Sequence, residues 1–143
     1  MKYFLNTDGG SRGNPGEAAI GIVIRSEKGE ALKKYGQAIG RATNNQAEYQ
    51  ALVFGLKKLK QLFGKDEMKQ AQVEARLDSE LVVKHLNHQY KIEDADLQPL
   101  FLQVWNLTLD FGGVKFIAVP RERNKEADKL VNEALDKKQG NLL

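Results

Sequence analysis

The sequence predicts an α/β fold built on a five-stranded mixed sheet. Three strand-like runs joined by short turns occupy residues 2–39. From Thr43 onward the apolar residues change to helical spacing, and two further short strands then alternate with helices. The expected order is therefore three strands, one helix, one strand, two helices, one strand and one helix.

The first three strands are expected to form an antiparallel meander. They are predicted at residues 2–7, 18–27 and 31–39. Residues 9–16 contain four glycines and one proline, so they are expected to form a turn between the first two strands. Residues 28–30 are expected to form the short hairpin turn that follows.

The first helix is expected to begin after Thr43, a residue type that caps helix N-termini well. Its apolar face consists of residues spaced by four, three and four positions: Leu52, Leu56, Leu59 and Phe63. Extending that face back by four residues reaches Glu48. A carboxylate on a core-facing stripe is unusual, so we expect Glu48 to point towards the sheet from the end of the helix.

The second half of the chain is expected to alternate strands with helices. Strands are predicted at residues 72–77 and 114–119, and a polar loop at residues 65–72. Three polar residues are expected to cap the remaining helices: Ser79, Asp96 and Asn124. A strand–helix–strand connection is normally a right-handed parallel crossover, so the fourth strand should lie beside the first and run the same way. Residues 138–143 are expected to fray.

Length and composition predict one globular domain over residues 1–143. Hydrophobic residues make up 41% and charged residues 29%, and the absence of cysteine excludes disulfides and thiolate metal sites. No long apolar run or signal-peptide pattern is present, so we expect a cytoplasmic monomer with no membrane partner. A net charge of +3 and a pI near 9.0 permit a polyanionic partner without requiring one.

Four carboxylates that are far apart in the sequence are expected to meet. Asp8 ends the first strand and Asp78 ends the fourth. Glu48 lies in the first turn of its helix, and Asp128 lies near the start of the last helix. Four negative charges in one cleft repel, so a cation must offset them. Ligation by oxygen alone is typical of Mg²⁺ or Mn²⁺, and a pair of such ions can displace groups at phosphate.

Other conspicuous residues are interpreted as structural. His85 and His88 lie three apart with no third ligand, so they are expected to be surface histidines. Trp105 and Phe101 are expected in a helix core rather than in base stacking. Three lysines are expected to form a solvated helix face that assists nonspecific binding: Lys57, Lys58 and Lys60. Three acidic residues are assigned to loops and caps: Asp94, Asp96 and Asp110.

Four motifs carry a resemblance to a known family: DGGSRGNPG at residues 8–16, TNNQAEYQAL at 43–52, LDSELVV at 77–83 and VPRERNKEADKL at 119–130. In this order and on these elements, they resemble type I ribonuclease H, in its short archaeal and bacterial form. The resemblance implies a ribonuclease H-like sheet of order 3-2-1-4-5 flanked by helices. It also implies an endonuclease that cuts the RNA strand of RNA–DNA hybrids and leaves 5′-phosphate and 3′-hydroxyl ends.

The resemblance assigns catalytic and metal-binding roles to the carboxylates of these motifs, which fall on Asp8, Glu48, Asp78 and Asp128. Two Mg²⁺ or Mn²⁺ ions would bind there with substrate and assist the attacking water and the departing 3′-oxygen. Many members have a histidine before the last helix, but this chain has none there, and Arg121 is the candidate in its place. Arginine stays protonated, so it is expected to stabilise charge or position phosphate.

Substrate contacts are expected from two segments that match family positions. Ser11 and Asn14 lie in the glycine-rich run, and Thr43, Asn44 and Asn45 stand at a helix N-terminus, where free N–H groups favour phosphate. Longer bacterial members add a basic protrusion, whereas residues 90–96 here are short and acidic. We therefore expect weaker hybrid affinity and a shallower salt dependence than in those members.

Three alternative functions stay open at this point. The first is a module that binds hybrid or double-stranded RNA without activity, although an unused cluster of like charges would be unfavourable. The second is a nuclease that also cleaves double-stranded RNA. The third is a domain that supports a larger assembly, as in reverse transcriptases, although a chain with its own start methionine argues against it.

Overall fold

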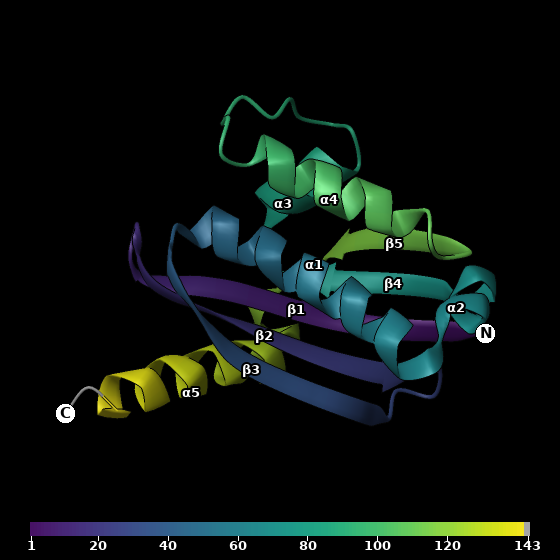
Figure 1. Cartoon of the computed structure of the whole chain (residues 1–143), viewed down its shortest axis with the longest axis horizontal. Helices are drawn as coiled ribbons and strands as arrows, with labels where there is room; N and C mark the ends of the chain where they lie inside the picture. The colour runs from purple at the N-terminus through teal and green to yellow at the C-terminus, as the bar shows by residue number, and fades with distance from the viewer. Residues whose placement is uncertain (142–143) are drawn as a thin grey trace.

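A computed structural model describes residues 1–141 of the chain (Figure 1). Its strands are β1 (Lys2–Gly13), β2 (Gly16–Ser26), β3 (Ala31–Ala42), β4 (Gln72–Leu77) and β5 (Gly113–Ala118). Its α-helices are α1 (Asn44–Phe63), α2 (Lys65–Gln70), α3 (Glu80–Leu86), α4 (Gln98–Thr108) and α5 (Lys125–Asn141). A single 3₁₀ turn, Arg121–Arg123, precedes α5.

The five strands form one sheet in the order β3-β2-β1-β4-β5, which confirms the predicted order. The first three strands are antiparallel, whereas β1–β4 and β4–β5 are parallel pairs. In the β1–β4 pair, Asn6 lies opposite Arg76. Asp8 and Asp78 each follow that pair by two residues, so they lie side by side at the same edge of the sheet.

Two helical layers cover the sheet. In Figure 1, α1, α3 and α4 lie on the near face of the strands and α5 lies on the far face. The alternation along β2 shows why both faces are buried. Ile22 and Ile24 belong to the main core beneath α1, whereas Ala19 packs against Val131 and Leu135 of α5. Within residues 1–141, no helix is long and apolar enough to cross a membrane.

Helix α1 begins at Thr43 as predicted. The Thr43 hydroxyl accepts a hydrogen bond from the Gln46 backbone N–H at 3.1 Å, and the Gln46 side chain accepts one from the Thr43 N–H at 2.8 Å. This reciprocal pair is a capping box. The predicted apolar face is also confirmed, because Leu52, Leu56 and Leu59 are fully buried.

The first turn of α1 lies directly against β1 at Gly9. A Cβ atom placed on Gly9 would lie 2.3 Å from the carbonyl carbon of Ala47 and 2.5 Å from the backbone nitrogen of Glu48. No side chain fits in that space. Only glycine at this position lets α1 approach the strand that carries Asp8.

The prediction of a turn over residues 9–16 is wrong, because this glycine-rich segment is mostly strand. β1 continues to Gly13 and pairs with β2 as far as Gly16, which leaves only Asn14 and Pro15 between them. Gly9 serves close packing against α1, whereas Gly13 and Gly16 flank the two-residue turn. Gly13 has a φ of +93°, and a Cβ on Gly16 would lie 2.1 Å from the Arg12 carbonyl oxygen on the other side of the turn.

The polar loop predicted at residues 65–72 is also wrong. Residues 65–70 form α2, whose Met68 is fully buried and anchors the helix on the core. A single apolar residue among charged neighbours gives too little periodicity to predict a helix this short.

The predicted cap at Asp96 is wrong as well. α4 begins after Leu97, and the Asp96 N–H instead donates to the Asp94 side chain at 2.8 Å in the preceding loop. At the other end of the chain, residues 138–141 are helical rather than frayed. Residues 142–143 lie outside the described part of the chain.

Two predictions about side-chain exposure are wrong. His85 is buried, with its Nδ1 atom 3.0 Å from the Tyr49 hydroxyl oxygen, and only His88 is at the surface. Trp105 is 44% exposed, whereas Phe101 packs against the core as expected. Helical spacing identifies a face but does not say which side of a broad face meets the core.

The predicted solvated lysine face is correct for Lys57 only. Lys58 lies over the rings of Tyr35 and Phe54. Lys60 forms an ion pair with Asp110 at 2.7 Å.

Gly9→Ala is expected to lower the free energy of unfolding by about 1–3 kcal/mol, because the methyl group overlaps backbone atoms that cannot rotate away. Urea unfolding measures this change. Gly140→Ala is the matched control, since nothing lies within 4 Å of its Cβ position in α5. Equal unfolding free energies for the two variants would contradict the close approach of α1 to β1.

Candidate active site

Three carboxylates meet where β1, β4 and the start of α1 converge. Asp8, Glu48 and Asp78 each offer one oxygen atom, and these atoms all lie within 4.8 Å of one another. They line a cavity of about 400 Å³ together with Asp128. The structure therefore brings all four predicted carboxylates to one cavity, with three in a tight cluster and the fourth at the wall.

Parallel pairing of β1 and β4 places Asp8 beside Asp78. Asp8 is only 6% exposed, and the side chain of Asp78, which directly follows β4, is 13% exposed. The chain turns at once after Asp78, because the Ser79 hydroxyl caps α3 by accepting from the Val82 N–H at 3.3 Å. This cap confirms the prediction for Ser79.

Glu48 enters the cluster from α1. Its side chain is 7% exposed, and its Oε2 atom is buried without a hydrogen-bond partner. The missing side chain at Gly9 allows this approach, because the Glu48 backbone nitrogen lies against that residue. A buried carboxylate oxygen without a partner is unfavourable unless something else satisfies it.

Asp128 reaches the cavity because α5 lies directly on β2. Gly21 stands opposite Asp8 across the β1–β2 pair, and a Cβ there would lie 2.1 Å from the Ala127 carbonyl oxygen. The absence of a side chain at Gly21 therefore allows Ala127, and Asp128 after it, to approach Asp8.

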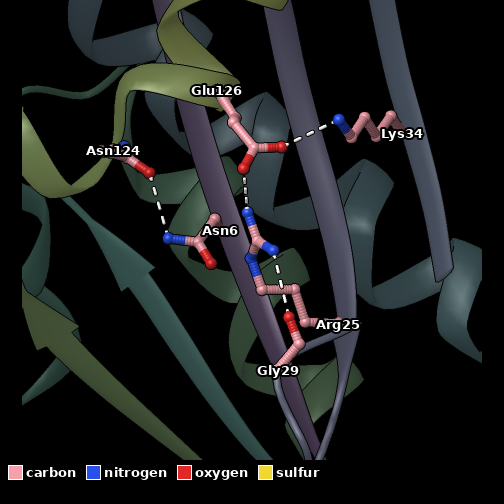
Figure 2. Close-up of polar contacts among 6 residues, drawn as sticks. All are labelled: Asn6, Arg25, Gly29, Lys34, Asn124 and Glu126. Carbon is pink, nitrogen blue, oxygen red and sulfur yellow. Dashed lines mark hydrogen bonds and ion pairs between the residues drawn. The ribbon is translucent and has the colours of Figure 1, made fainter. Parts of the chain in front are cut away.

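Asn124 fastens the start of α5 to the sheet (Figure 2). It is 2% exposed; its side-chain amide donates to the Thr7 carbonyl at 2.8 Å, and its oxygen accepts from Asn6 at 3.3 Å. Thr7 immediately precedes Asp8, so this bond links the loop before α5 to the strand end at the site. The predicted side-chain cap is wrong: Asn124 occupies the position before the helix, but its side chain bonds to β1.

An ion-pair network at the surface continues this attachment (Figure 2). The Glu126 carboxylate accepts from Lys34 at 2.9 Å and from Arg25, and Arg25 also donates to the Gly29 carbonyl at 3.2 Å. Lys34 and Arg25 hold the pKa of Glu126 below its usual range. Exposed pairs of this kind contribute about 1 kcal/mol or less, so the network mainly orients α5 on β2 and β3.

Arg121 lies at the rim of the cavity on the 3₁₀ turn. Its Nε atom is 3.8 Å from an Asp78 oxygen, and 86% of its side chain is exposed. An exposed pair at this separation is weak, so the side chain is free to contact a ligand in the cavity. The catalytic role expected for Arg121 stays a prediction.

Three of the residues predicted to contact substrate, Ser11, Asn14 and Asn44, form one hydrogen-bonded group beside the carboxylates. The Asn44 side-chain oxygen accepts from the Ser11 N–H at 2.9 Å and from its hydroxyl at 3.1 Å, while Asn14 accepts from the Asn44 N–H at 3.0 Å. Ser11, Asn44 and Asn45 line the cavity. Two further residues hold that wall in place. Asn14 does so by accepting from the Asn44 N–H, and Thr43 does so by capping α1.

Besides Ser79, which was predicted only as a helix cap, two polar residues that line the cavity were not predicted as site residues. Asn132 lies one turn after Asp128 and donates to the Asp128 carbonyl at 3.1 Å. Asn132 follows Asp128 by four residues in the same helix, and this spacing could have predicted that both side chains lie on one face. Arg12 bonds to Asp136 at 2.6 Å and to Gln139 at 3.0 Å, and no local sequence signal marks contacts this distant in the chain.

Burial raises the pKa of each carboxyl in the cluster. It raises the pKa of Asp8 to about 7, and the negative charges of Asp78 and Asp128 add to this effect. The pKa of Glu48 is raised well above its usual value by burial and by the charge of Asp8. Burial also raises the pKa of Asp78, against the opposing influence of the Arg121 guanidinium. The fully ionised cluster is thus unfavourable without a positive partner.

Comparison with known proteins agrees with this geometry. A family model described as reverse transcriptase-like matches residues 6–134. Ribonuclease HI of Halobacterium salinarum is 44% identical over 129 residues, which cover 90% of this chain and 62% of that protein. The crystal structure of LC11-RNase H1, isolated from compost, is 42% identical with a TM-score of 0.90, and the match covers 96% of this chain and 98% of that one. The chain belongs to the type I ribonuclease H family.

Relatives within this family differ in length. A bifunctional protein of Mycobacterium tuberculosis is 41% identical over 139 residues, and this chain spans only 36% of its length. LC11-RNase H1 has also been solved in complex with an RNA/DNA hybrid, at 40% identity and a TM-score of 0.90. A foamy virus protease-reverse transcriptase, at 20% identity and a TM-score of 0.69, shares the fold.

The site suits a divalent cation of the kind on which the type I ribonuclease H family depends. Its donors are all carboxylate oxygens, which Mg²⁺ and Mn²⁺ prefer. The buried Glu48 Oε2 atom has no other partner, and a cation would satisfy it. Asp8, Glu48 and Asp78 are the residues placed to hold such an ion.

Asp8→Asn is expected to stabilise the metal-free protein at about pH 8 by about 1–2 kcal/mol, because the wild-type carboxyl must ionise in a buried, negatively charged site. Burial raises the pKa of Asp8 in the folded protein to about 7, above its ordinary value of 3.8. The unfolded chain therefore releases the Asp8 proton at lower pH than the folded protein does. The free energy of unfolding of the wild type should fall as the pH rises from about 4 to about 7.

Thermal unfolding in EDTA from about pH 4 to pH 9 measures this effect through the expected displacement of Tm with pH. Glu93→Gln, in the exposed α3–α4 loop, is the control and should follow the wild-type curve. Adding Mg²⁺ should raise the wild-type Tm at high pH more than that of Asp8→Asn. Superimposable curves for wild type and Asp8→Asn would contradict the electrostatic account.

Proposed function

We propose that this chain is an endonuclease that hydrolyses the RNA strand of RNA–DNA hybrids with two divalent cations, Mg²⁺ or Mn²⁺, and yields 5′-phosphate and 3′-hydroxyl ends. The observation that carries the proposal is the cluster of Asp8, Glu48 and Asp78 oxygens within 4.8 Å, in a cavity that Asp128 also lines. Membership of the type I ribonuclease H family and the hybrid complex of LC11-RNase H1 support the choice of substrate.

The positions of the four carboxylates suggest how they would share the binding of the cations. Oxygens of Asp8, Glu48 and Asp78 form the tight cluster, and Asp128, which also lines the cavity, adds further carboxylate oxygens to it. Divalent cations bound there would supply an acidified water and charge stabilisation at the in-line oxygens of phosphate. The protein's own contribution is to hold these carboxylates in place, since short caps and close backbone packing fix every element that carries them.

Five residues are proposed to hold the substrate backbone: the hydrogen-bonded Ser11, Asn14 and Asn44, with Thr43 and Asn45 at the start of α1. Several of their oxygens are already occupied: Asn44 accepts from Ser11, and Asn14 accepts from Asn44. With these oxygens engaged, the side-chain amide N–H groups of the two asparagines are the donors proposed to bind phosphate or sugar. The start of α1 adds a favourable field for an anion.

Several expectations stay predictions within this proposal. They are the single-domain extent of residues 1–143, the cytoplasmic location, the monomeric state, cleavage of double-stranded RNA and weak hybrid affinity. The α3–α4 loop is consistent with weak affinity, because its exposed residues Glu93, Asp94 and Asp96 would repel a phosphate backbone. An inactive binding module is disfavoured because all four carboxylates reach one cavity.

Cleavage of an end-labelled RNA–DNA hybrid in Mg²⁺ and in Mn²⁺ tests the proposed function. Wild type is expected to cut the RNA strand only, and Asp8→Asn to lose at least about 10²-fold in kcat, because Asp8 is the most central oxygen donor. Asp66→Asn, an exposed carboxylate of α2, is the control. If the folded protein binds metal and binds hybrid in EDTA but cleaves no substrate, the proposed activity is contradicted and the chain is an inactive binding module.

Arg121→Ala is expected to lower kcat by about tenfold or more, because the guanidinium is the one cationic group proposed to face the reacting phosphate. Arg123→Ala is a matched control on the same 3₁₀ turn, outside the lining of the carboxylate cavity. Arg121→Lys should recover part of the rate if charge is what matters. Equal kcat values for the two alanine variants would remove Arg121 from the mechanism.

A further inference from the structure

We propose that the buried Tyr49–His85 pair is a positioning unit that fixes helix α1, which carries Glu48, relative to helix α3, which follows Asp78. The pair thereby sets the separation of these two carboxylates. The inference rests on the proposed function, because it assigns the pair a role in holding the metal-binding cluster.

The pair lies in the interior between the two helices. Tyr49 is fully buried and His85 is 6% exposed. The Tyr49 hydroxyl oxygen and the His85 Nδ1 atom are 3.0 Å apart, which is a good hydrogen-bond distance. The two rings are nearly parallel, at 19°, with centroids 6.2 Å apart. Both side chains are therefore held in defined orientations.

One end of the pair is joined directly to the site. Tyr49 follows Glu48 in the first part of α1, and successive residues of a helix point about 100° apart. Glu48 can thus face the carboxylate cluster while Tyr49 faces α3. A rotation of this part of α1 that moved the Glu48 carboxylate would have to move the Tyr49 ring as well.

The other end is joined to Asp78 through a short rigid segment. α3 contains only seven residues, starts directly after the Asp78–Ser79 step and is fixed there by the Ser79 cap. His85 lies in the last turn of the same helix. The Tyr49–His85 hydrogen bond consequently joins α1, which carries Glu48, to α3, which directly follows Asp78 and Ser79.

A hydrogen bond between α1 and α3 restrains their relative position more strictly than apolar packing does. The surrounding core, to which Leu52 of α1 and Val82 of α3 belong, is built from apolar side chains, which tolerate small sliding movements. A buried hydrogen bond adds little net stability but requires one distance and direction. Such a restraint is useful beside carboxylates that repel one another, because a metal site needs its donors held within about 0.5 Å.

Both partners are neutral near pH 7, which suits a permanent restraint. Burial lowers the pKa of His85 and raises the pKa of Tyr49. The hydrogen bond therefore forms between uncharged groups.

Tyr49→Phe in the full chain tests the role, because it removes the hydroxyl and keeps the ring. The readouts are the affinity for Mn²⁺ alone, from calorimetry on metal-free protein, and kcat and KM on the hybrid. We expect Mn²⁺ affinity and kcat to fall about tenfold with little change in KM, at the lower end of effects seen when outer partners of metal ligands are removed. His85→Leu should behave alike, whereas His85→Gln, which keeps a hydrogen-bonding group, should recover most of the loss.

Val104→Ala is the control, since Val104 is fully buried in α4 away from the cavity. It should lower Tm without changing Mn²⁺ affinity. The double variant Tyr49→Phe/His85→Leu should lose no more Mn²⁺ affinity than either single variant if the two residues act as one unit. Additive losses would contradict such a unit.

The metal readout separates this inference from the proposed function. Weaker Mn²⁺ binding by Tyr49→Phe in a protein that cleaves no hybrid would support the positioning role while the nuclease assignment fails. Wild-type Mn²⁺ affinity and kcat in Tyr49→Phe, with only a lower Tm as in Val104→Ala, would overturn the inference and leave the pair as part of the core.

Discussion

The carboxylates of Asp8, Glu48 and Asp78 repel one another, and the fold holds one oxygen of each within 4.8 Å of the others, with Asp8 and Glu48 almost fully buried. Burial and mutual repulsion both favour protonation, which is why the pKa of Asp8 is raised to about 7. Any element that carries one of these groups is pushed away from the others. The packing around the site can be understood as the set of contacts that resist this force until a cation offsets it.

Those contacts are mostly backbone contacts. Gly9 admits the first turn of α1 against β1, and Gly21 admits α5 against β2, in both cases at distances that no side chain would allow. Asn124 then ties the start of α5 to the residue before Asp8. Because backbone cannot change rotamer, these contacts fix Glu48 and Asp128 more firmly than side-chain packing would.

The fold and the carboxylate cluster could largely be predicted from the sequence, because both follow from local patterns joined by one topological rule. Capping at Thr43, the stripe from Leu52 to Phe63 and the parallel crossover were enough to bring Asp8, Glu48 and Asp78 together. The errors arose where a residue's role depends on a distant partner. Gly9 was assigned to a turn because its contact with Ala47 is not visible in the sequence, and His85 was assigned to the surface because its partner Tyr49 lies 36 residues away. Asn124 was predicted as a cap for the same reason.

The most direct test of the central claim is a crystal structure of the wild-type chain with Mn²⁺, examined by anomalous scattering. The account predicts an ion bound to oxygens of Asp8, Glu48 and Asp78 at about 2.0–2.2 Å. It also predicts that the buried Glu48 Oε2 atom, which has no hydrogen-bond partner within the protein, becomes a ligand. An ordered cluster at neutral pH with no anomalous peak, its carboxyls hydrogen-bonded to one another, would contradict the account.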